Sequence, residues 1–80
     1  MELNVKLYGT LSRPFDDYDH VTGLGVSIVQ GGASIQDLLL HLNINPKGIG
    51  MVFMDGGPVK LETLLKGGAR IKIFQPIFGG

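Results

Sequence analysis

One stretch of the chain can form an amphipathic helix, and this limits how a sheet built from the other segments can be covered. Its apolar residues follow the helical spacing i, i+3, i+4 and i+7: Ile35, Leu38, Leu39 and Leu42. Ser34 before this stripe and Asp37 three residues later form a capping-box pattern, while Asn43 and Pro46 end the helix after about two turns. Since one short helix can cover only one face of a sheet, we expect a sheet with one apolar face packed on it.

The remaining hydrophobic patterns predict strands. Apolar and polar residues alternate at residues 2–8, 24–28 and 69–73, as in half-buried strands. A short apolar run at 51–54 is followed by Asp55-Gly56, a strong tight-turn signal, and by a short edge strand at 58–60. Residues 9–23 are expected to form a polar loop, and residues 61–65 to add one helical turn.

This order of elements predicts an α+β fold of the ubiquitin-like β-grasp type. A mixed sheet of four to five strands would pack on one main helix. The first and last strands have the cleanest alternation, so we expect them side by side at the sheet centre, parallel because a helix crosses over between them. The domain is predicted to span residues 1–75, followed by a flexible C-terminal tail at residues 76–80.

Charge and composition exclude several functional classes. Seven Lys and Arg balance seven Asp and Glu, which argues against nucleic acid as a partner, because binding phosphates needs a cationic surface. The chain has no Cys, no apolar run long enough to cross a membrane and no basic-then-apolar leader, so we expect a cytoplasmic protein without a membrane partner. The charges are unevenly divided: residues 1–40 hold five acids and two bases, and residues 41–80 hold two acids and five bases.

Few residues are suited to catalysis. His20 and His41 are the only imidazoles, and no Ser has a general base in view. The acidic run at residues 16–20 lacks the spacing of a calcium loop, which favours a solvated loop over a cation site. We therefore predict no catalytic residue, no metal site and no bound cofactor.

The C-terminal segment has the most informative motif, Phe74-Gln75-Pro76-Ile77-Phe78-Gly79-Gly80. Ordering five such residues costs about 5–10 kcal/mol, with glycine costing most. Burying Ile77 and Phe78 would return only about 3–6 kcal/mol. A glycine pair therefore suits a backbone that must pass where no side chain fits, so that a carboxylate reaches another protein's active site. The competing interpretation is a frayed terminus.

With this motif behind the last strand, the chain resembles the ThiS/MoaD sulfur carriers of thiamine and molybdopterin synthesis. The resemblance implies that an E1-like adenylating enzyme uses ATP to activate the Gly80 carboxylate, which a sulfur-donor protein converts to a thiocarboxylate. Gly79 would allow passage through the enzyme's channel, and Pro76, Ile77 and Phe78 would dock the tail. The acceptor would be the molybdopterin synthase large subunit or thiazole synthase, and the carrier itself would not be an enzyme.

Two other functions use the same features differently. A ubiquitin-like modifier would be joined to protein lysines through the same carboxylate. A non-covalent interaction module would instead use the sheet face near Lys60, Arg70 and Lys72, which are also the predicted partner-docking residues of the carrier. The resemblance leaves the thiamine and molybdopterin branches open, as well as the role of the acidic loop and the effect of the bulky Phe78 before the glycine pair.

Overall fold

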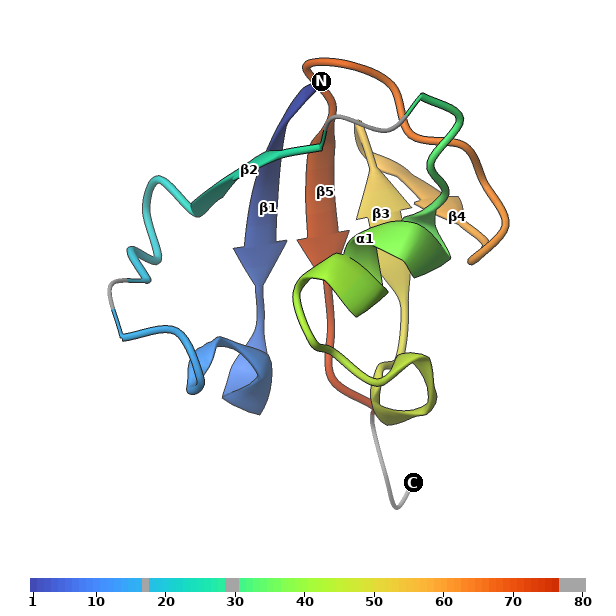
Figure 1. Cartoon of the computed structure of the whole chain (residues 1–80). Helices are drawn as coiled ribbons and strands as arrows, with labels where there is room; N and C mark the ends of the chain where they lie inside the picture. Colours follow the sequence, from blue (N-terminus) through green and yellow to red (C-terminus); the bar gives the residue numbers. More distant parts are fainter. Residues whose placement is uncertain (17, 29–30, 77–80) are drawn as a thin grey trace.

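The computed structural model describes residues 1–16, 18–28 and 31–76, and it shows a five-stranded mixed sheet with one α-helix on one face (Figure 1). The strand order is β2-β1-β5-β3-β4, which confirms the β-grasp prediction. The elements are β1 (Glu2–Leu7), η1 (Gly9–Ser12), β2 (Leu24–Ser27), α1 (Ile35–His41), η2 (Pro46–Gly48), β3 (Val52–Met54), β4 (Gly57–Val59) and β5 (Arg70–Ile73), where η marks a 3₁₀ helix.

The two central strands come from opposite ends of the chain. β1 and β5 are parallel, with Val5 opposite Ile71, and β2 and β3 flank them in antiparallel orientation. This confirms the predicted central pairing. Side chains that alternate along β1 and β5 point to opposite faces, so Val5 and Ile71 are buried beneath α1 while their sequence neighbours lie on the outer face, the face opposite α1.

The core lies between α1 and the inner face of the sheet. Its largest fully buried side chains are Val5, Leu7, Ile35, Leu38, Leu39, Ile71 and Ile73. The capping box is present at the start of α1: the Asp37 amide donates to Ser34 Oγ at 3.3 Å, and the Ser34 amide donates to Asp37 Oδ2 at 2.8 Å. Asn43 follows α1 with a φ of 59°, a left-handed conformation that ends helices. The described helix is too short to cross a membrane.

The β3–β4 hairpin turns at the predicted dipeptide. Asp55 and Gly56 have φ values of 51° and 88°, as the left-handed two-residue turns of hairpins require. The Asp55 side chain also joins this turn to the next strand, because Arg70 N donates to Asp55 Oδ1 at 2.9 Å. The turn is thereby fixed against β5.

The predicted helical turn at residues 61–65 is wrong. Residues 61 and 62 instead form a turn, in which Thr63 N donates to Lys60 O at 3.1 Å. The segment lies beside the start of α1, where Ile35 N donates to Thr63 O at 2.9 Å and Gln36 N donates to Leu61 O at 3.0 Å. The first amides of a helix have no partner within the helix, so these carbonyls satisfy them. A helical turn would have used the same carbonyls internally. The loop at residues 9–23 also differs from expectation, since it contains η1.

Candidate functional site

The segment that follows β5 continues along the sheet before it leaves the domain. We call residues 74–76 the exit segment. Tyr8 N donates to Ile73 O at 3.0 Å on one side, and on the other Phe74 N donates to Met51 O at 2.9 Å and Gly50 N donates to Phe74 O at 2.8 Å. The chain is therefore hydrogen-bonded on the β1 side up to Ile73 and on the β3 side at Phe74, which fixes the direction in which the backbone departs.

Gln75 adds a side-chain anchor. Its Oε1 accepts from the Thr10 amide at 2.9 Å and from Thr10 Oγ1 at 3.0 Å. On the opposite side, a Cβ added at Gly50 would lie 2.8 Å from Gln75 O and 3.1 Å from Pro76 Cα. Position 50 must therefore be glycine for the backbone to leave along this path.

Gly50→Ala is expected to displace the exit segment. The new methyl group meets backbone atoms that cannot rotate away, so we expect a loss of unfolding free energy of about 1–3 kcal/mol. Gly48→Ala, two residues earlier, is the matched control: an added Cβ meets nothing within 4 Å, and stability should change by no more than about 0.5 kcal/mol. Thermal unfolding measures both. Equal effects for the two variants would contradict the close approach at Gly50.

An aromatic patch surrounds the exit segment on the outer face. Phe74 stacks on Tyr8, with ring centroids 4.5 Å apart and planes 10° apart, and meets Phe53 edge-on at 5.6 Å. Met51 lies beside them with 56% of its surface exposed, and these four residues line one shallow hollow with Gly50 and Gln75. Partly exposed apolar side chains around one hollow are typical of a surface that binds another protein.

Two of the predicted docking residues lie together next to this patch. Arg70 and Lys72 are exposed on the outer face of β5, and they line a hollow with Lys6 and Asp55. Lys6 stands in β1 opposite Lys72. The structure thus adds a third cation to the pair that the sequence indicated.

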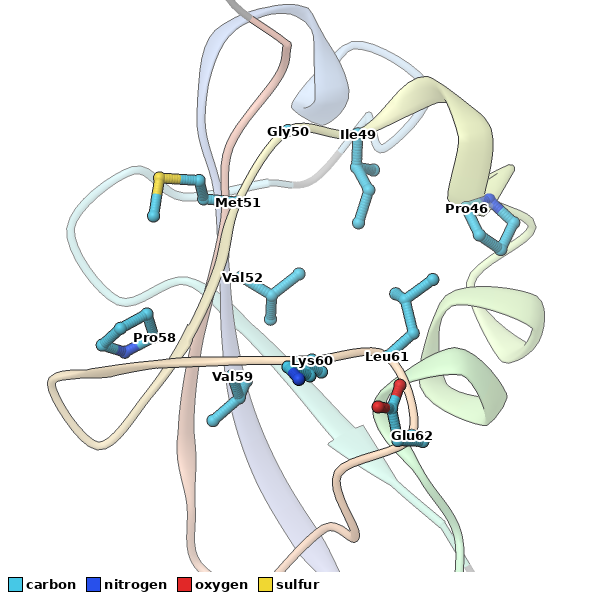
Figure 2. A pocket seen from close by; sticks show the side chains of 10 residues that line it. All are labelled: Pro46, Ile49, Gly50, Met51, Val52, Pro58, Val59, Lys60, Leu61 and Glu62. Carbon is cyan, nitrogen blue, oxygen red and sulfur yellow. The ribbon is translucent and has the colours of Figure 1, made fainter.

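Lys60 lies in a different place. It follows β4 and lines a groove with Pro46, Ile49, Leu61 and Glu62, between the β3–β4 hairpin and the segment around η2 (Figure 2). Figure 2 shows Met51 and Pro58 on the side of the hairpin away from the helices, and Ile49 and Leu61 on the helix side. Arg70 and Lys72 do not line this groove.

The remaining predicted site residues are at the end of the chain. Pro76 is half-buried next to Gly50. Ile77, Phe78, Gly79 and Gly80 lie outside the described residues. The aromatic patch is not among the predicted sites, although the sequence carries a signal for it. Tyr8, Phe53 and Phe74 occupy outward-facing positions of the strand pattern, where polar residues are usual.

The acidic loop uses one carboxylate for its own structure. Asp19 Oδ1 accepts from the amides of Val21 at 2.7 Å and Thr22 at 3.3 Å. These hydrogen bonds stabilise the charged form and hold the pKa of Asp19 below its usual value. Among residues 1–16, 18–28 and 31–76, no three His, Asp or Glu side chains form a group that could hold a metal ion.

Comparisons with known proteins agree with this geometry. The model of the ThiS family matches residues 15–80. The fold resembles a crystal structure of SAMP1 from Haloferax volcanii, with 19% identity, full coverage of both chains and a TM-score of 0.71. It also resembles a chain in the complex of subunits 1 and 2 of molybdopterin-converting factor from Helicobacter pylori, with 19% identity, full coverage of both chains and a TM-score of 0.60. No curated protein matches.

Proposed function

The chain belongs to the ThiS family, and on this premise we propose that it is a sulfur carrier whose Gly80 carboxylate is the reactive group. A carboxylate is inert to sulfur nucleophiles until one oxygen becomes part of a leaving group. Attack of the carboxylate on the α-phosphorus of ATP would release pyrophosphate and form an acyl adenylate. The terminal sulfur of a donor-protein persulfide would then attack the acyl carbon and displace AMP, which gives an acyl disulfide. A thiol would cleave the S–S bond of this intermediate, leaving a thiocarboxylate on Gly80 and a disulfide between the thiol and the donor. In this scheme the carrier supplies the acyl group, and an E1-like adenylating enzyme holds ATP and does the catalysis.

The observation that carries the proposal is the anchored exit segment within an aromatic patch. The Phe74 backbone is bonded to Met51 and Gly50 on one side, and the Gln75 side chain is bonded to Thr10 on the other, so the tail starts from a defined position on the domain. A partner that covers Tyr8, Phe53 and Phe74 would therefore receive the tail at one defined point. Gly79 would let the backbone enter a narrow channel, with Pro76, Ile77 and Phe78 packed at its entrance.

Membership of the family supports two alternative acceptors of the sulfur. The Helicobacter pylori neighbour is a complex of two subunits of molybdopterin-converting factor. We propose that this chain likewise docks on a partner subunit, either a molybdopterin synthase large subunit or thiazole synthase. The two acceptors differ in the product that receives the sulfur, and each can be assayed with the loaded carrier.

A second candidate function is protein modification. Two of the similar crystal structures are of small archaeal modifier protein 1 from Haloferax volcanii. The second of them has 18% identity and a TM-score of 0.69, and the match covers 95% of this chain and 98% of that one. A modifier would use the same adenylation but would end as an amide on a lysine of another protein.

The intact mass of the chain tests these proposals. The full chain is incubated with ATP, an E1-like adenylating enzyme from the same organism, a persulfide-bearing sulfur donor and a thiol that cleaves the acyl disulfide. We expect a mass increase that corresponds to one sulfur replacing one oxygen, located by fragmentation at Gly80. Isopeptide adducts on cell proteins, without a free thiocarboxylate, would favour the modifier. A chain that remains unchanged with an enzyme active on another carrier would contradict both.

A further inference from the structure

Basic and aromatic side chains are arranged in adjoining rows on the outer face. Lys6 in β1 stands opposite Lys72 in β5, and Lys72 in turn stands opposite Phe53 in β3. Just beyond the ends of β5 and β1, Phe74 stacks on Tyr8 at the point from which the chain departs. We call Lys6, Arg70 and Lys72 the cationic row, because all three line the hollow beside the aromatic patch.

This arrangement is unfavourable for the isolated domain. Adjacent strands lie about 4.8 Å apart, and like charges directly opposite each other destabilise a sheet. Arg70 adds a third positive charge two residues before Lys72, about 7 Å along the strand. Among the residues lining this hollow, Asp55 is the only carboxylate, and its Oδ1 accepts from the Arg70 backbone amide. The local charge is therefore positive although the formal net charge of the chain is zero.

We propose that the cationic row recognises an acidic surface on the adenylating enzyme, next to the apolar surface that covers the aromatic patch. This inference rests on the proposed function and adds a charge requirement to the partner. Carboxylates of a partner placed over Lys6 and Lys72 would relieve the repulsion between these two side chains. The repulsion that destabilises the free domain would therefore favour formation of the complex. The two rows adjoin, so one partner surface reaches both. Complementary charge of this kind increases association rates and excludes partners of the wrong sign.

Lys6→Glu separates recognition from folding. The variant replaces a Lys–Lys pair across β1 and β5 by a Glu–Lys pair, so its melting temperature should equal or exceed that of the wild type. Its KM as substrate in ATP-dependent pyrophosphate release by the adenylating enzyme should rise about tenfold or more, with little change in kcat. Added salt should raise the KM of the wild type and have a smaller effect on the variant. A purely structural role of Lys6 would lower the melting temperature together with activity.

Lys66→Glu is the matched control. Lys66 is exposed four residues before β5 begins, whereas the exit segment follows the end of β5, and the substitution makes the same change in net charge. Its KM should stay within about twofold of the wild type. If Lys66→Glu and Lys6→Glu raise KM equally, the effect comes from the net charge of the chain. The proposed local contact between the cationic row and the enzyme would then be wrong.

The remaining outcomes distinguish the inference from the proposed function. The wild-type chain could be activated with a KM that changes neither with salt nor with Lys6→Glu. This result would contradict an acidic enzyme surface over the cationic row and leave the carrier function in place. Wild-type chain that supports no pyrophosphate release at any ionic strength, with an enzyme active on another carrier, would overturn both.

Discussion

A chain that ends at Phe78 is expected to fold as the full chain does and to lose ATP-dependent activation. Each residue removed shortens the reach of the backbone by about 3.5 Å, so the carboxylate would stop about 7 Å short of the ATP α-phosphorus. Misplacement by even about 1 Å can cost 100-fold in rate, so we expect pyrophosphate release to fall by at least that factor. Unfolding should be unchanged, because the shortened chain retains all the contacts described among residues 1–76.

Two further chains make this test specific. Gly80→Ala keeps the length and the carboxylate but adds a methyl group, and it should be activated more slowly than wild type if the channel admits only glycine. A chain extended by one alanine moves the carboxylate past the reacting position and should also fail. Pyrophosphate release that is equal in the full and the shortened chains would exclude Gly80 as the reactive residue and favour the non-covalent interaction module.

Phe74→Ala is expected to have the second-largest effect, on both stability and partner binding. The ring is half-buried and makes two aromatic contacts, with Tyr8 and Phe53. Removing it should lower the unfolding free energy by about 2 kcal/mol, since each aromatic pair contributes about 0.5–1.5 kcal/mol. An aromatic residue at the centre of an interface commonly contributes 2 kcal/mol or more, so affinity for the adenylating enzyme should fall about 30-fold.

Leu40→Ala provides the comparison on the opposite side of the molecule. Leu40 is 58% exposed on α1, and its substitution also truncates a large apolar side chain. Stability should change by no more than about 0.5 kcal/mol, and affinity should stay at the wild-type value. Affinity is measured by titration at a temperature where both variants are folded. Equal weakening by Leu40→Ala would move the interface from the outer face of the sheet to the helix.

Local patterns were sufficient to predict most of the fold. Three correctly predicted features each depend on residues a few positions apart: the apolar stripe that begins at Ile35, the Ser34–Asp37 capping box and the Asp55-Gly56 turn. Such features are determined by backbone geometry and side-chain periodicity, which the sequence displays directly. The prediction failed at residues 61–65, because their backbone carbonyls are bonded to the amides of α1 more than twenty positions away.

The candidate site divides in the same way. The glycine pair and Arg70 and Lys72 could be singled out from the sequence, since a tail motif and the outward positions of one strand are local features. The aromatic residues and Lys6 also occupy outward positions of predicted strands, but the sequence could not show that they gather on one surface. Tyr8 and Lys6 lie in the half of the chain with an excess of acids, and they meet Phe74 and Lys72 only because β1 and β5 pair in parallel.

By itself, therefore, the sequence determined the elements, the fold class and a tail suited to carboxyl chemistry. The tertiary structure decided which side chains surround the base of that tail, and that Lys60 lies in a groove separate from Arg70 and Lys72. The physical reason is range. Helix periodicity, capping and turns act between near neighbours, whereas a surface made by strands from both ends of the chain depends on the register in which those strands pair.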